Sequence, residues 1–297
     1  MKRWMQATAI TAGCVLVYVG MRSLPVEPCS FLHYGDYINE EGVIEGCGYE
    51  ETAFFDLGEI RFPILTQLRP LEEPEAGKPV PMELVLTTTT GNPVRWEEIA
   101  VSHTERIHAM VVDPSLEDYQ HLHPQPTGAP GHYTFTIHPK KAGTYAVYLD
   151  LIPLTNSRRT LLSDSLAVPG DPPVAALRES LVHRHGNLAL RFRPHQERLP
   201  AGKDVTFSLE VTNTGGGKTA FSPVMDSYAH VVAFDPDREG FAHLHPQNPF
   251  LEGQDPMNPE LDFVFRFDEP GLYRVWAQMI VNGEQIFAPF DLRVEAS

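Results

Sequence analysis

The chain repeats itself, and this repetition constrains its fold more than any other feature of the sequence. The stretch HAMVVDPSLEDYQHLHP, residues 108–124, is matched by HVVAFDPDREGFAHLHP, residues 230–246, which begins 122 positions later. Two further pairs of segments match: LRPLEEPEAGKPVPMELVLT with FRPHQERLPAGKDVTFSLEVT, and KKAGTYAVYLDLI with DEPGLYRVWAQMI. A period of this length indicates two copies of one domain, which a chain of 297 residues can accommodate.

Within each copy, bulky apolar residues recur at every second position, as they do in half-buried strands. Segments such as DVTFSLEV, HYTFTI, TYAVYLDL and LYRVWAQMIV are rich in β-branched and aromatic residues, and Gly, Pro, Asn and Asp separate them. This pattern predicts about seven strands per copy. A Gly-x-Tyr precedes a strand in both copies, at Tyr145 and Tyr273, as does the corner tyrosine of immunoglobulin sandwiches. We therefore expect an all-β chain of two tandem antiparallel β-sandwiches, immunoglobulin-like or cupredoxin-like.

Composition shifts divide the rest of the chain. The predicted organisation is a signal anchor or signal peptide at 1–22, an N-terminal extension at 23–66, a first sandwich at 67–170, a linker at 171–186 and a second sandwich at 187–297. The linker begins with a proline turn, and we expect a short helix at 174–182.

The N-terminus is typical of a targeting segment. Lys2 and Arg3 precede an uncharged run at 4–21, which Arg22 closes. We expect an uncleaved membrane anchor with the remaining chain on the extracytoplasmic side of the cell envelope. Cleavage, giving a secreted or periplasmic protein, is the alternative. Either location is oxidising, which predicts a Cys29–Cys47 disulfide.

The net charge argues against one class of partner. The chain has 23 Lys and Arg against 39 Asp and Glu, a formal charge of −16. Such a surface repels phosphate backbones, so we expect no nucleic acid partner.

The histidine motif fits a β-hairpin. If 107–112 and 119–123 are strands joined by DPSLED, Met110 lies opposite His121 and His108 lies opposite His123. Because side chains alternate between the faces of a strand, all three histidines then share one face. The second copy repeats this arrangement with His230, His243 and His245.

Three converging neutral imidazoles are a suitable ligand set for copper or zinc. The predicted metal ligands are therefore His108, His121, His123, His230, His243 and His245, with His103, Met110 and Met225 as additional candidates. An alternative is structural: Val112, Tyr119, Phe234 and Phe241 share the histidine face, so the imidazoles could instead close the end of each sandwich core by hydrogen bonding to backbone carbonyls.

On these residues, the chain resembles bacterial exported proteins described as YtkA-like or heavy-metal-binding. The resemblance rests on a histidine, twelve residues, then His-Leu-His-Pro, followed by Gly-x-Tyr and a closing strand such as NGEQIFAPFDLRV. More distantly it resembles CopC-like periplasmic copper proteins, although their N-terminal histidine region has no counterpart here. The resemblance implies an exported β-sandwich that handles copper or another metal through the six histidines of the repeated motif.

Three functions follow from these observations. The first is a membrane-tethered protein that holds or transfers copper, or alternatively zinc, through three-histidine sites. The second is a non-enzymatic interaction module for an envelope partner, with structural histidines. The third is an enzyme, which is disfavoured because no Ser-His-Asp elbow, phosphate loop or His-Glu-x-x-His is present, although a copper oxidoreductase activity stays open.

Overall fold

The computed structural model describes residues 2–22, 38–44, 54–57, 62–247 and 253–297. The chain divides into two compact units, Met1–His33 and Tyr34–Ser297. The first unit contains α1 (Lys2–Arg22), which coincides with the predicted membrane segment. Among the residues described, no helix combines the length and the apolar character needed to cross a membrane. The predicted Cys29–Cys47 disulfide lies outside the described residues.

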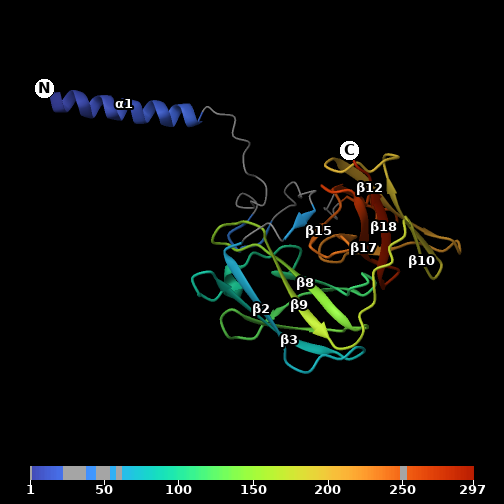
Figure 1. The fold of residues 1–297 in the computed structure, drawn as a ribbon. Coiled ribbons are helices and arrows are strands. Elements are labelled where there is room, and N and C mark those ends of the chain that lie inside the picture. The colour runs from blue at the N-terminus through green and yellow to red at the C-terminus, as the bar shows by residue number, and fades with distance from the viewer. Residues whose placement is uncertain (1, 23–37, 45–53, 58–61, 248–252) are drawn as a thin grey trace. The chain divides into compact units, whose positions relative to one another are not determined.

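The second unit consists of strands, and Figure 1 shows those of the two sequence repeats gathered in separate halves. The first repeat has two sheets, in the orders β2-β3-β7-β6 and β5-β4-β8-β9. Its strands are β2 (Ile64–Pro70), β3 (Val80–Thr88), β4 (Ile107–Val112), β5 (Tyr119–Leu122), β6 (Gln125–Pro126), β7 (His132–Ile137), β8 (Gly143–Leu151) and β9 (Thr160–Val168). A 3-10 turn, η2 (Trp96–Glu98), follows β3.

The second repeat also has two sheets. One has the order β10-β11-β12-β16, and the other has β1-β15-β14-β17-β13 with β18 paired to β17. The strands are β10 (Val182–His185), β11 (Leu188–Pro194), β12 (Asp204–Asn213), β13 (Phe221–Ser222), β14 (His230–Phe234), β15 (Gly240–Leu244), β16 (Asp262–Arg266), β17 (Gly271–Val281) and β18 (Glu284–Val294). All strand pairs in both repeats are antiparallel, which confirms the predicted all-β sandwich class.

Each repeat has its own apolar core between its two sheets. One cluster includes Met82, Leu84 and Tyr145, and the other includes Phe192, Phe207 and Phe290. The corner tyrosines form as expected, because Tyr145 accepts a hydrogen bond from the Lys141 N–H (3.0 Å) and Tyr273 donates one to the Glu269 carbonyl (3.0 Å). These contacts tie the start of β8 and of β17 to the preceding turn.

The predicted helix at 174–182 is wrong. Residues 171–179 form no regular element, and β10 begins at Val182 and pairs with β11. The residues of β10 alternate between exposed and half-buried, as on an edge strand, and pairing with β11 decides the structure of this segment.

The N-terminal extension contributes to the second repeat's sheet, which its sequence did not suggest. Its strand β1 (Phe55–Asp56) pairs with β15, placing Phe55 opposite Phe241. Another part of the extension contacts the first repeat, since the Ile44 N–H donates to the Val101 carbonyl (2.9 Å). The described part of the extension therefore touches both repeats.

Candidate metal centre

The first histidine hairpin has the predicted register. Met110 lies opposite His121 and Val112 opposite Tyr119 in the β4–β5 pair. The turn between them is organised by Asp113, whose carboxylate accepts hydrogen bonds from the backbone of Ser115 (3.1 Å) and Glu117 (2.8 Å). This confirms that Asp113 forms the turn, as its Asp-Pro sequence indicates.

The second hairpin has the same geometry. In the β14–β15 pair, Val231 lies opposite Leu244 and Val232 opposite His243. Asp235 closes this turn by accepting from the Gly240 N–H (3.0 Å). Because the two hairpins share their register, the histidines of each repeat lie on one face of its sheet.

That face is not part of either sandwich core. The core clusters contain Ala109 and Val111 of β4, whereas His108 and Met110, which point to the opposite side, are buried without belonging to them. This side faces the other repeat: the ring centroids of His108 and His243 are 5.5 Å apart, and those of Tyr148 and Phe241 are 4.9 Å apart. The histidines therefore lie between the repeats rather than at the end of a sandwich core.

Equivalent residues of the two repeats make equivalent contacts across this interface. The Leu116 carbonyl accepts from Trp276 Nε1 (3.1 Å), and the Arg238 carbonyl accepts from the Tyr148 hydroxyl (2.6 Å). In the aligned repeats Leu116 corresponds to Arg238 and Tyr148 to Trp276. The two repeats thus meet about a pseudo-twofold axis, like the subunits of an isologous dimer.

The six motif histidines meet at this interface as one cluster. The His108 and His243 rings, from different repeats, have centroids 5.5 Å apart, and those of His121 and His243 are 5.3 Å apart. Two groups have all their ligand nitrogens within 4.8 Å of one another: His108 with His121 and His243, and His230 with His243 and His245. The second predicted trio is therefore brought together, whereas in the first His243 takes the place of His123.

Hydrogen bonds orient the first histidine of each motif in the same way. His108 Nε2 lies 3.0 Å from the Ser102 carbonyl, and His230 Nε2 lies 2.9 Å from the Val224 carbonyl. Nε2 must donate to a carbonyl, which leaves Nδ1 as the nitrogen with a lone pair. In His108 this Nδ1 lies 3.2 Å from His121 Nε2.

The second histidine of each motif is held by the opposite repeat. His243 Nδ1 lies 3.1 Å from Asp150 Oδ2, and His121 Nδ1 lies 2.9 Å from Gln278 Oε1. Asp150 and Gln278 occupy equivalent positions in the aligned repeats. Each Nδ1 donates to an oxygen of the other repeat, so each Nε2 carries the lone pair, as in histidines whose outer hydrogen bond fixes their metal-binding nitrogen.

Asp150 is a buried carboxylate in a charge-assisted network. Arg159 Nη2 donates to its Oδ2 (2.6 Å) and to the His243 carbonyl (3.2 Å). Burial by itself would raise the pKa of Asp150, but the Arg159 guanidinium and the bond from His243 hold it well below its usual range. Asp150 therefore stays ionised beside His243.

Burial keeps the histidines neutral. Desolvation, and secondly the nearby His243, lower the pKa of His123 to about 4 and bring those of His108 and His121 well below 6.5. The pKa values of His230 and His245 are lowered for the same first reason. Neutral imidazole is the form that coordinates metal ions.

Three buried ring nitrogens of the cluster lack a hydrogen-bond partner within the described part of the chain: His123 Nε2, His230 Nδ1 and His243 Nε2. A buried polar atom without a partner typically costs about 1–3 kcal/mol. Coordination to a metal ion would satisfy the lone pairs of His230 Nδ1 and His243 Nε2, whose other ring nitrogens are already hydrogen-bonded.

The three additional candidate ligands, His103, Met110 and Met225, differ in where they lie relative to the histidine cluster. The His103 ring, on a loop with a left-handed φ of 50°, stacks on His245 with centroids 3.5 Å apart, so it adjoins the second repeat's histidines rather than completing its own repeat's trio. Met110 is fully buried and paired with His121 across the strands. Met225 shares the φ of 50° of His103 and is half-buried.

Asp150, Arg159 and Gln278 were missed by reasoning from sequence. For Asp150 and Gln278 the signal is a polar residue at equivalent positions of two largely apolar strands, TYAVYLDLI and LYRVWAQMI, whereas Arg159 lies outside these segments. A second signal was the apolar HAMVV of β4, which indicates a strand buried on both faces.

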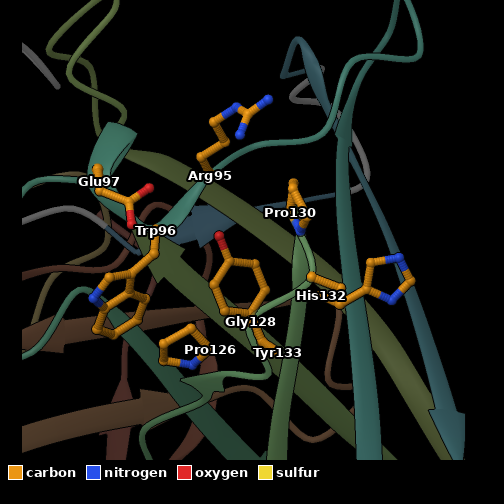
Figure 2. Close-up of a pocket in the computed structure, with 10 residues that line it drawn as sticks. Arg95, Trp96, Glu97, Pro126, Gly128, Pro130, His132 and Tyr133 are labelled. Carbon is orange, nitrogen blue, oxygen red and sulfur yellow. The ribbon is translucent and has the colours of Figure 1, made fainter.

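A surface pocket lies apart from the cluster, on the first repeat (Figure 2). It is lined by Arg95, Trp96, Glu97, Pro126, Gly128, Ala129, Pro130, Gly131, His132 and Tyr133. Its histidine, His132, lies 3.0 Å from Glu83 Oε1 through Nδ1. The pocket therefore does not gather nitrogen ligands as the interface does.

The fold and this interface define a class: a tandem β-sandwich protein whose two repeats enclose a histidine cluster. The chain belongs to the family described as domain of unknown function DUF8832, which matches residues 66–161 and 186–296 and so covers both repeats. No curated protein matches the chain.

Among solved structures, the chain is similar to the CbhA fibronectin(III)-like modules of Clostridium thermocellum, with 12% identity, 78% of this chain and 95% of that chain covered, and a TM-score of 0.19. It is also similar to a DUF4785 family protein of Legionella pneumophila, with 10% identity, 78% of this chain and 57% of that chain covered, and a TM-score of 0.27. Neither similarity bears on the function of this chain.

Proposed function

We propose that this protein binds a copper ion, or alternatively a zinc ion, in the histidine cluster between its repeats, and holds or transfers it without catalysing a reaction. The observation that carries the proposal is the two groups of three histidines that share His243. In each group the ligand nitrogens lie within 4.8 Å of one another. A metal–nitrogen bond of about 2.0–2.1 Å requires nitrogens somewhat closer than this, so a small inward movement of the rings completes a site.

A purely structural role explains the cluster less well. Interface histidines that serve only packing should have both ring nitrogens satisfied or exposed, because an unsatisfied buried nitrogen is costly. In this cluster His123 Nε2, His230 Nδ1 and His243 Nε2 are buried without a partner in the portion described. The other nitrogens of His230 and His243 are held by hydrogen bonds that leave these atoms directed inward.

One side chain beside the histidines, that of Met110, favours copper over zinc. Neutral imidazoles suit both metals, but a thioether is a soft ligand that favours Cu(I). Met110 is buried on the histidine face, directly opposite His121. Zinc remains the alternative because nitrogen donors alone support a tetrahedral zinc site.

We also propose that the protein works outside the cytoplasm. The uncharged run at 4–21 after Lys2 and Arg3 is typical of an export signal. A copper-holding protein in the cell envelope would require no nucleic acid partner, in keeping with the charge of −16.

Metal analysis of the full chain tests the proposal. The protein is purified without a histidine tag, stripped with chelator, reloaded with Cu or Zn and analysed by elemental mass spectrometry. We expect a saturating content that the combined substitution His121→Ala, His123→Ala, His243→Ala and His245→Ala abolishes. Metal at about 100 times its Kd should also stabilise the wild-type chain by about 2.7 kcal/mol, visible as a higher Tm.

The matched control is His132→Ala, since His132 lies on the outer sheet of the first repeat and contacts Glu83. It should leave metal content unchanged. Metal content that is unaffected by the fourfold substitution would reject the proposal. The envelope interaction module with structural histidines would instead show no change in Tm on chelation and a lower Tm in every histidine variant.

A further inference from the structure

The two groups of three histidine ligands have one histidine in common. We call His108, His121 and His243 triad A, and His230, His243 and His245 triad B. Triad A takes two of its ligands from the first repeat, whereas triad B lies entirely in the second repeat. His243 is their common member.

His243 has one nitrogen to offer. Its Nδ1 is engaged by Asp150 Oδ2 at 3.1 Å, and its buried Nε2 has no hydrogen-bond partner within the described ranges. An imidazole nitrogen carries a single lone pair in the ring plane, so Nε2 coordinates one ion at a time. Occupation of triad A therefore excludes occupation of triad B.

The remaining ligands lie close around this shared atom. The His121 and His230 rings, from different triads, have centroids 6.2 Å apart, and the His230 and His243 rings are 6.1 Å apart. An ion bound to His243 can exchange the other two ligands without a large movement of the backbone. The exchange changes which repeat supplies most of the ligands.

We propose that the centre takes one ion per chain and passes it between triads A and B while His243 remains bound. This inference rests on the proposed function and adds to it a stoichiometry and a route. The duplicated motif then provides two alternative positions for one ion, rather than one independent site in each repeat.

Copper(II) binding to the full chain tests the inference. Stoichiometry is measured by equilibrium dialysis, and the ligand environment by electron paramagnetic resonance. The wild-type chain should bind one ion and give two overlapping nitrogen-coordinated signals. His121→Ala breaks only triad A and His245→Ala breaks only triad B, so each variant should still bind one ion and should retain one of the two signals.

Two further variants remove both positions. His243→Ala and the double variant His121→Ala with His245→Ala should each lose affinity by at least the factor of about 10–100 that loss of an outer-shell partner costs. Circular dichroism and Tm establish that these variants are folded. If His243→Ala does not fold, the wild-type stoichiometry and the two single variants still decide the question.

The outcomes separate the inference from the function on which it rests. Two ions per chain, full binding by folded His243→Ala, or loss of all binding in His121→Ala or His245→Ala alone would overturn the shared position. A wild-type chain that binds no ion overturns the proposed function, and the inference with it.

Discussion

At the scale of single residues, Asp150 and Gln278 define the difference between the repeats. Each holds the Nδ1 of a histidine from the opposite repeat, but Asp150 is charged and is paired with Arg159. A carboxylate increases the basicity of the imidazole that donates to it, more than a neutral amide does. We therefore expect His243 to be a stronger metal ligand than His121.

Asp150→Asn tests this positioning role. The substitution keeps the shape but removes the charge, and we expect metal affinity to fall by about 10–100-fold. It also leaves the Arg159 guanidinium buried without its counter-charge, at a cost of about 3–5 kcal/mol in stability. Isothermal titration with Cu(II) measures the affinity, and urea unfolding measures the stability.

The double variant Asp150→Asn with Arg159→Met separates the two effects. Removing both charges should recover much of the lost stability and none of the lost affinity. If affinity recovers together with stability, Asp150 serves only to fold the interface. Gln278→Asn shortens the side chain that holds His121 Nδ1 in the equivalent contact, and it should lower affinity less.

At the scale of elements, burial on both faces distinguishes the strands that carry the site. All residues of β4, β14 and β15 are buried, because one face lies in a sandwich core and the other lies against the opposite repeat. The outer strand β3 instead alternates between buried and half-buried residues. An edge strand, β1, covers the free side of β15.

Gly240→Ala should detach β1 from β15. A Cβ at this position would lie 2.0 Å from the Phe55 carbonyl oxygen, a backbone atom that cannot yield without moving the strand. Such overpacking costs about 1–3 kcal/mol. We expect faster hydrogen exchange at Leu57 N–H, which donates to the Glu239 carbonyl, together with a lower urea midpoint.

Gly271→Ala serves as the control, since its added Cβ would meet only Tyr273 at 3.7 Å, an ordinary contact. It should leave the exchange rate of Leu57 unchanged. Equal exchange rates in both variants and the wild type would show that β1 does not depend on the close approach at Gly240.

At the scale of the whole molecule, the two repeats act as a fused isologous pair within one compact unit, Tyr34–Ser297. The equivalent hydrogen bonds accepted by the Leu116 and Arg238 carbonyls hold the two histidine-bearing sheets face to face. The histidine cluster consequently depends on the association of the repeats. An ion held by His108, His121 and His243 would stabilise that association because these ligands come from both repeats.

The metal-free protein should lose stability as the pH falls from about 7 to about 5. The folded chain keeps His123 neutral down to a pKa of about 4 and His103 to about 3, chiefly through burial, whereas unfolded imidazoles have a pKa of about 6.5. Below that value the unfolded state binds more protons, so stability present above about pH 6.5 is lost as the pH falls.

Urea midpoints measured at successive pH values check this expectation. An uptake of two or more protons on unfolding corresponds to a slope of about 2.7 kcal/mol or more per pH unit. The variant lacking His121, His123, His243 and His245 should give a flatter profile. A wild-type stability that is constant between pH 7 and pH 5 would contradict burial of neutral histidines in the folded state.

The sequence by itself determined the strands and the shared histidine face. Alternation in segments such as HYTFTI depends on local side-chain periodicity, and the Asp-Pro turns fix the hairpin register, so both are readable from neighbouring residues. The short helix predicted at 174–182 does not form. There, pairing with β11 decided the structure.

Only the tertiary structure decided what the histidine face meets. The alternation of side chains along a strand assigns His108, His121 and His123 to one side of a sheet. This alternation does not specify whether solvent, a core or another domain covers that side. The association of the repeats brings His243 to His108 and His121, and brings Asp150 to His243. These contacts join residues far apart in the chain, and the physical reason is complementary packing of two sheets, which no local pattern encodes.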